Sequence, residues 1–122
     1  MQHALSGVRV LDLTQVMAGP FCTMLLCDMG ADVIKVEPPG GDPTRTWGER
    51  GQHDTPEFNA VNRGKRSVVV DLKSDDGRAV VQRLASGADV LIESYRPGVM
   101  TSFGLDYATL KDRYPALIYA SI

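Results

Sequence analysis

Two polar segments of this sequence each follow an apolar run and could take part in binding a ligand. Residues 14–19 follow the apolar run 8–13, and residues 94–96 follow the run 88–93. Both runs have the composition of strands that are buried on two faces. Ligands of open parallel α/β sheets bind beyond the carboxyl ends of the strands, so the two segments are expected at one rim. The alternative for the first segment is a plain strand-to-helix connection with a tight turn at Gly19, and spacing alone does not separate the two.

The first segment is not a dinucleotide fingerprint. It contains Ala18, Gly19 and Pro20 where the pattern G-x-G-x-x-G would be required, and the proline lacks one of the N–H donors that hold a pyrophosphate. Cys22 and Cys27 lie on different faces of the helix expected to follow, and we predict that both are buried free thiols. A catalytic cysteine is the alternative, although no histidine lies nearby in the sequence.

A basic turn is a further candidate site. Arg63, Lys65 and Arg66 place three positive charges around Gly64, immediately before an apolar segment. Such a turn can bind a phosphate. The alternative is a solvated turn that leads into a strand.

A long loop is expected between residues 38 and 55, because its prolines and glycines cannot sustain a helix or a central strand. This loop exceeds the roughly 12 residues of a passive connection. It contains Trp47 with Arg45 and Arg50 on either side, and also Glu49 and His53. The pattern predicts a lid that faces a substrate or partner, or else a solvated loop anchored by one buried tryptophan.

Alternating strands and helices would position these residues. Segment 8–39 has the pattern of strand, loop, helix and strand, with Pro20 at the start of the helix and Gly30 at its end. Such βαβ crossovers are right-handed in nearly all proteins, so strands 8–13 and 32–37 should be parallel. The expected fold class is therefore α/β, Rossmann-like, with a mostly parallel sheet flanked by helices.

Further elements follow along the chain. In order, we expect helix 56–62, strand 67–72, a helix that Ser74 caps and Gly87 ends, strand 88–93, a short helix between Pro97 and Gly104, helix 107–113 and strand 116–122. Two apolar stripes recur at helical spacing. One consists of Phe21, Met24, Leu25 and Met29, and the other, expected to be buried, of Val80, Val81 and Leu84.

Composition limits the possible functions. The chain has 122 residues, of which 43% are hydrophobic and 23% charged, as is usual for one globular domain. Its net charge of −2 argues against a nucleic-acid binder or an anionic-membrane binder. No apolar run approaches the roughly 20 residues of a membrane span, and the N-terminus lacks the features of a signal peptide, so a cytoplasmic location is expected.

Four motifs together resemble the N-terminal part of the class III coenzyme A transferases, the L-carnitine dehydratase and bile-acid-inducible protein F family. They are GVRVLDLTQVMAGPFCTMLLCDMGADVIKVEPPGGD, NRGKRSVVVDLK, ADVLIESYRPGVMTSFGL and LIYASI, and they cover essentially the whole chain in order. The resemblance implies a single Rossmann-like CoA-binding domain over residues 1–122, which binds acyl-CoA and a small carboxylic acid and forms a homo-oligomer. Formyl-CoA transferase and α-methylacyl-CoA racemase both belong to this family.

The resemblance places the catalytic group outside this sequence. In the transferases an aspartate is acylated through a mixed anhydride, and that aspartate follows the strand that resembles LIYASI. The aspartates at positions 12, 28, 32, 71 and 89 do not match it. We therefore expect no catalytic residue in this chain, which would be truncated before the catalytic segment and inactive alone. A racemase-like member and a truncated, non-catalytic dimeric binding module are the alternatives.

The family's CoA-binding positions can be carried over to this sequence one at a time. The resemblance assigns contacts with CoA to three segments, namely Gln15, Val16, Met17 and Ala18, then Val70, Asp71, Leu72 and Lys73, and then Ser94, Tyr95 and Arg96. It places Trp47 in the acyl pocket and Lys73 near a phosphate, and it implies no metal. Two positions that usually hold arginine are here Pro38 and Ser102, for which Arg96 could compensate.

Overall fold

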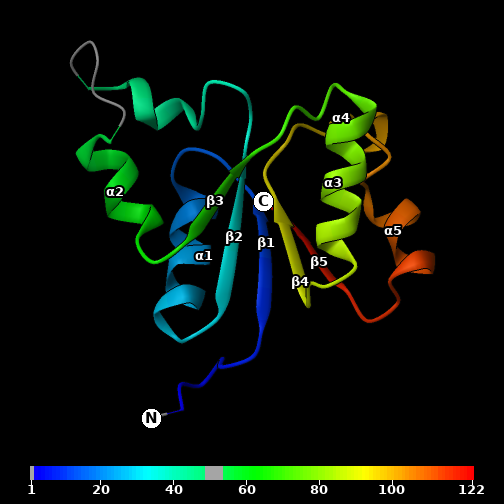
Figure 1. Cartoon of the computed structure of the whole chain (residues 1–122), viewed down its shortest axis with the longest axis horizontal. Coiled ribbons are helices and arrows are strands. Elements are labelled where there is room, and N and C mark those ends of the chain that lie inside the picture. The colour runs from blue at the N-terminus through cyan, green and yellow to red at the C-terminus, as the bar shows by residue number, and fades with distance from the viewer. Residues whose placement is uncertain (1, 49–53) are drawn as a thin grey trace.

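A five-stranded sheet in the order β3-β2-β1-β4-β5 forms the centre of the computed structural model, which describes residues 2–48 and 54–122 (Figure 1). Its strands are β1 (Arg9–Leu13), β2 (Asp32–Glu37), β3 (Arg66–Val69), β4 (Val90–Glu93) and β5 (Ile118–Ser121). All neighbouring strands are parallel, which confirms the predicted α/β class. The strand order reverses on either side of β1, and ligands of such sheets bind at this switch point.

Helices cover the two faces of the sheet unequally. They are α1 (Ala18–Asp28), α2 (Pro56–Asn62), α3 (Asp75–Ala85), α4 (Val99–Ser102) and α5 (Tyr107–Arg113), together with the short 3₁₀ helix η1 (Pro43–Thr46). The larger core includes Leu11 and Leu91 of the sheet and Val81, Met100 and Leu110 of α3, α4 and α5. On the opposite face, α1 covers a smaller apolar cluster and also contacts α2. The right-hand part of the sheet in Figure 1 is therefore covered mainly on the α3 side.

Side chains on the α1 face change from apolar to charged along β1 and β2. Because strand residues two apart share a face, Val10 and Asp12 of β1 point to the α1 side, as do Val33, Lys35 and Glu37 of β2. Both valines are buried in the smaller cluster. The three charged side chains are equally buried, at 0–1% exposure. The carboxyl half of this face is thus a buried polar layer.

The predicted helix stripes were only partly correct. On α1, Met24 is buried, but Phe21, Leu25 and Met29 are 50%, 39% and 47% exposed. The inward positions of this helix are held by small or short side chains, including Gly19 and Thr23. Spacing alone does not tell which face of a helix is covered, and here the longest apolar side chains point outward.

The stripe predicted on α3 includes one exposed residue and leaves out two small buried ones. Val80 is 43% exposed, whereas Val81 is fully buried and Leu84 packs against the core from the side. Gly77 and Ala85 complete the buried face. They lie four residues before and four residues after Val81, so the three residues share one side of the helix. Glycine is required at position 77 because the start of α3 lies against the backbone of Asp71.

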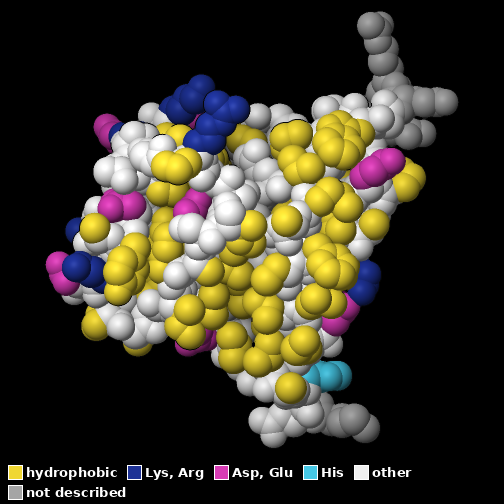
Figure 2. All heavy atoms as spheres, turned by 180° about the vertical axis from the view of Figure 1, so that it is seen from behind, with side chains coloured by type: hydrophobic (Ala, Val, Ile, Leu, Met, Phe, Trp, Pro, Cys, Tyr) yellow, Lys and Arg dark blue, Asp and Glu magenta, His cyan; other side chains and the backbone are white. Residues whose placement is uncertain are grey.

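Hydrophobic side chains are exposed over much of the α1 face. Figure 2 views the molecule from behind and shows these side chains spread across the surface. They include Met17 and Phe21 of the α1 region, and Ile118 and Ile122 of the β5 region at 63% and 57% exposure. Since Ala120 packs on the α1 side, alternation places Ile118 and Ile122 on that side too.

The cysteines of α1 were predicted to be buried free thiols. They are free, but both are only partly buried. Burial and the neighbouring Asp28 raise the pKa of the Cys27 thiol. A raised pKa disfavours the reactive thiolate, so Cys27 has the character of a structural residue.

Substituting Gly77 by alanine tests the close approach of α3. Alanine normally stabilises a helix relative to glycine, but a Cβ at position 77 would lie 1.9 Å from the carbonyl oxygen of Asp71. We expect Gly77→Ala to lower the free energy of unfolding by about 2 kcal/mol in urea denaturation. Exposed Ala79 is the control, where Ala79→Gly should lower stability by about 1 kcal/mol. A more stable Gly77→Ala variant would contradict the packing described.

Candidate functional site

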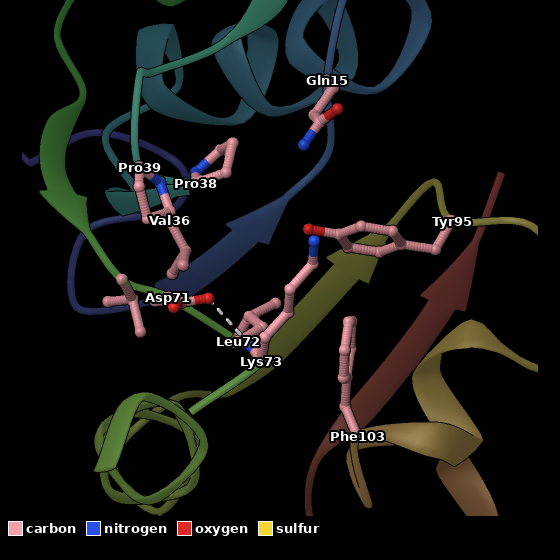
Figure 3. A pocket seen from close by; sticks show the side chains of 10 residues that line it. Gln15, Val36, Pro38, Pro39, Asp71, Leu72, Lys73, Tyr95 and Phe103 are labelled. Carbon is pink, nitrogen blue, oxygen red and sulfur yellow. Dashed lines mark hydrogen bonds between the residues drawn. The ribbon is translucent and has the colours of Figure 1, made fainter. Parts of the chain in front are cut away.

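A cavity of about 390 Å³ lies at the carboxyl ends of the central strands (Figure 3). Residues from the ends of four strands line it, together with one residue of the α4 region. They are Gln15, Val36, Pro38, Pro39, Val70, Asp71, Leu72, Lys73, Tyr95 and Phe103. Its volume is within the range of small-molecule sites, and its lining is mostly apolar with a few polar groups.

Tyr95 forms one wall of the cavity and is held in place from two sides. Its backbone N–H donates to Oε2 of Glu93 at 2.8 Å, and its ring packs edge-to-face on Phe103 with centroids 6.1 Å apart. Burial and the nearby Glu93 raise the pKa of the Tyr95 phenol. The hydroxyl is therefore protonated at neutral pH and can donate or accept one hydrogen bond within the cavity.

Lys73 supplies the positive charge of this site. Its backbone N–H donates to Oδ1 of Asp71 at 2.9 Å, the bond drawn in Figure 3. The side chains of Lys73 and Tyr95 extend into the cavity from different strand ends. None of the ion pairs found between described residues involves Lys73. Its ammonium group is thus available to an anionic ligand.

The structure brings six of the predicted site residues together at this cavity. They are Gln15, Val70, Asp71, Leu72, Lys73 and Tyr95. Ser94 lies behind it, where its Oγ accepts a hydrogen bond from the Gln15 N–H at 3.1 Å. Arg96 instead lines a wider hollow of about 730 Å³, which shares Tyr95 with the cavity.

Four other predicted residues do not line the cavity. Val16, Met17 and Ala18 form the turn into α1, and Met17 is 46% exposed. Trp47, which was expected in the acyl pocket, follows η1 and is 54% exposed. The alternative of a loop anchored by a buried tryptophan is therefore wrong.

The rest of the predicted lid is only partly described. Arg45 turns inward, where its Nε lies 2.7 Å from Oε2 of Glu37. Its guanidinium carbon lies over the Phe58 ring, 3.6 Å from the ring centroid. Glu49, Arg50 and His53 lie outside the described residues. An arginine fixed in this way does not act as a mobile arm of a lid.

The basic turn lies away from the cavity, and its charges are paired within the chain. Arg63 pairs with Asp28 at 2.5 Å, and Arg66 pairs with Asp32 at 2.6 Å. Asp32 begins β2 and Arg66 begins β3, so this second pair lies at the amino edge of the sheet. The hydrogen bonds from Arg66 lower the pKa of the Asp32 carboxyl. The prediction that this turn binds phosphate is not supported.

Lys65, the third cation of the turn, reaches inward rather than toward solvent. Its side chain is 2% exposed, and its Nζ lies 3.0 Å from Oδ2 of Asp12. It also donates to the Pro20 carbonyl at 2.9 Å and to Oδ1 of Asn62 at 2.8 Å. Burial lowers the pKa of Lys65 even though Asp12 favours the charged form. The solvated-turn alternative is therefore also wrong for this residue.

Sequence reasoning missed a second ionic cluster, which lies directly behind the rim. Lys35 pairs with Asp42 at 2.9 Å, and Glu37 pairs with Arg45. Burial opposes ionisation of Glu37, but hydrogen bonds from Arg45, from Ser67 and from the Asp42 N–H outweigh it and lower the pKa to about 2. The signal was available, because charged residues two apart in an apolar strand share one face.

Comparison of this chain with known proteins identifies its family. The model of CoA-transferase family III matches residues 5–122. The chain belongs to CoA-transferase family III. It is 50% identical over 124 residues to succinyl-CoA:mesaconate CoA-transferase of Haloarcula hispanica, covering 98% of this chain and 31% of that protein. It is 48% identical over 121 residues to human succinyl-CoA:glutarate CoA-transferase, covering 97% of this chain and 27% of that protein.

A solved structure has the same fold. A CAIB/BAIF family protein from Brucella suis aligns with a TM-score of 0.94 at 46% identity, covering 99% of this chain and 33% of that one. This chain thus spans about a third of the length of the relatives that it matches. The resemblance inferred from the four motifs is confirmed.

Residues 2–48 and 54–122 contain no helix that is long and apolar enough to cross a membrane. No three His, Cys, Asp or Glu side chains in the described ranges are grouped so that they could hold a metal ion.

The acid stability of this family III chain should depend on Glu37. Its pKa is lowered from 4.5 to about 2, so its contribution is complete above pH 4.5 and is lost as the pH falls toward 2. The loss amounts to about 3 kcal/mol of unfolding free energy, at about 1.4 kcal/mol per pKa unit. Urea denaturation between pH 2 and pH 6 should show it.

Glu37→Gln should lower stability at pH 6 and flatten this dependence. Glu57→Gln removes an exposed carboxylate of α2 and is the control, which should keep the wild-type acid dependence. An unchanged slope in Glu37→Gln would show that other carboxylates cause the acid sensitivity.

Proposed function

We propose that residues 1–122 form the CoA-thioester-binding domain of an enzyme that transfers CoA between carboxylic acids. One observation carries this proposal: a mostly apolar cavity lies at the switch point of a family III sheet, and the Lys73 ammonium in it forms no ion pair with another described residue. CoA combines an adenine and a pantetheine arm with three negatively charged phosphates, and the cavity offers matching chemistry. Aromatic and proline side chains can pack on the organic parts, and Lys73 can pair with a phosphate.

The names of the relatives support transfer rather than racemisation. The two curated relatives described above are named as transferases that act between succinyl-CoA and either mesaconate or glutarate. No observation in the cavity favours moving an α-proton, so a racemase stays an alternative without support of its own. The acyl groups that this protein handles are proposed only as a class, namely small carboxylic acids carried as CoA thioesters.

We further propose that the acylated aspartate lies outside residues 1–122. Asp12 and Asp42 are fully buried, and other side chains occupy their carboxylate oxygens. Asp28 and Asp32 pair with arginines, away from the cavity. Asp71 lines the cavity, and its Oδ1 accepts a hydrogen bond from the Lys73 backbone N–H at the start of a turn. Asp12, Asp28, Asp32 and Asp42 therefore offer no free carboxylate for an acyl transfer, and Asp71 does not match the position of the acylated aspartate, which follows the last strand.

Binding of CoA is the direct test. Isothermal calorimetry on the purified protein should show a salt-sensitive association, which Lys73→Ala weakens about tenfold, as for one lost charge-assisted phosphate contact. Arg96→Ala should weaken it about as much if the ligand extends past Tyr95 into the wider hollow. Lys111→Ala removes an exposed lysine from α5 and should leave the affinity unchanged. Absence of CoA binding to the unmodified protein would refute the proposed function.

We also propose that the protein is a homo-oligomer. Large exposed apolar side chains gather on the α1 face, and such surfaces mark sites of contact with other protein chains. Sedimentation at micromolar concentration should show an oligomer, and Leu25→Glu should reduce its mass. Val80→Glu changes an exposed apolar residue of α3, on the other face, and should leave assembly intact. A monomeric unmodified protein would contradict the proposal.

A further inference from the structure

Val16 has an unusual backbone conformation at the rim. Its φ is 70°, which makes it the one residue other than glycine with a positive φ in the described parts of the chain. Valine is branched at Cβ, and this left-handed region is strained for such side chains. Strain of this kind persists only where surrounding contacts enforce it, and it is concentrated at functional sites.

Side chains hold three successive backbone N–H groups at this point of the chain, those of residues 14–16. The Thr14 N–H donates to Oδ1 of Asp12 at 2.9 Å, and the Gln15 N–H donates to Oγ of Ser94 at 3.1 Å. The Val16 N–H donates to Oδ2 of Asp42 in a longer bond of 3.4 Å. The turn is therefore fixed by its surroundings and not by its own sequence preference.

One buried ion pair contacts the backbone on both sides of Gln15, immediately before the strained residue. Lys35 and Asp42 have side chains 1% and 0% exposed, with Nζ 2.9 Å from Oδ2. The same Nζ donates to the Thr14 carbonyl at 2.9 Å. Asp42 is fixed in turn, because its Oδ1 accepts from the N–H and hydroxyl of Thr44 at 2.9 and 2.6 Å. The pair thus anchors the Thr14 carbonyl and the Val16 N–H while itself remaining immobile.

Neither charged residue lines the cavity, so their effect on a ligand must be indirect. Gln15, the residue between the two anchored groups, does line it. We propose that Lys35 and Asp42 are positioning residues that hold Val16 in its left-handed conformation and so orient Gln15 toward a bound CoA thioester. This inference rests on the proposed function.

The test removes the ion pair without leaving one buried charge alone. Lys35→Met or Asp42→Asn by itself leaves an uncompensated charge and should destabilise the fold, whereas the double variant removes both charges with little change of shape. We expect the double variant to recover most of the melting temperature lost in either single variant. Its affinity for CoA should still be about tenfold weaker than that of the unmodified protein, since Val16 can leave the left-handed region.

Glycine at position 16 separates this role from a merely structural one. Glycine adopts a positive φ without strain, so adding Val16→Gly to the double variant should recover about threefold or more of the lost affinity. Val16→Ala in the same background removes nearly as much side chain, but its Cβ still disfavours the left-handed region, and it should recover less. A melting curve measured beside each calorimetric titration shows whether stability explains the change.

Single substitutions at position 16 give a test that does not depend on the double variant folding. With the ion pair intact, Val16→Gly and Val16→Ala should bind CoA within about twofold of each other, because the pair enforces the left-handed conformation in both. A large difference between them would overturn the proposal, since it would show that the pair does not enforce this conformation. The proposal also fails if the double variant binds CoA as tightly as the parent, or if glycine rescues no better than alanine. Failure of the unmodified protein to bind CoA would instead refute the proposed function.

Discussion

Three charged side chains buried under α1 determine much of this structure. Asp12, Lys35 and Glu37 project from neighbouring strands into a layer that water does not reach. An unpaired buried charge costs several kcal/mol, so each must find a partner of opposite charge. The partners are Lys65, Asp42 and Arg45, which come from the segments that follow α2 and β2. Pairing therefore fixes where these segments cross the end of the sheet.

The same pairing shapes the cavity at the carboxyl edge. The chain that leaves β2 must bring Asp42 back over Lys35, which places Pro38 and Pro39 at the cavity wall. The buried layer is also complete, since no buried side-chain nitrogen or oxygen of the described residues lacks a hydrogen-bond partner. A satisfied polar network is rigid, and a rigid support suits a site whose ligand must be held in one orientation.

Much of the fold followed from local sequence signals. The strand Asp32–Glu37 and the helices Pro56–Asn62 and Tyr107–Arg113 have the predicted bounds, because prolines, caps and glycines mark their ends. Local signals did not reveal which helix face is covered, and this accounts for exposed Val80. The spacing of Lys35 and Glu37 places both on one face of the strand, but it does not identify the partner of Lys35. That partner, Asp42, is brought to Lys35 only when the following loop turns back over the sheet. The cavity residues that follow β1, β3 and β4 were among those predicted, whereas Pro38 and Pro39 after β2 were not, and Trp47, far from any strand end, does not line the cavity.

Arg45 has a consequence for how proteins of this kind can diverge. Its guanidinium bonds to Glu37 before the long loop and to Asp54 near the end of it, and the Thr55 hydroxyl donates to the Thr44 carbonyl at 2.7 Å. Contacts between the two ends of the loop thus close it at its base. Lengthening a closed loop adds little entropy cost, so insertions between Arg45 and Asp54 would leave the sheet and the cavity floor undisturbed. Evolution could lengthen the loop beside the binding site while the framework stays constant.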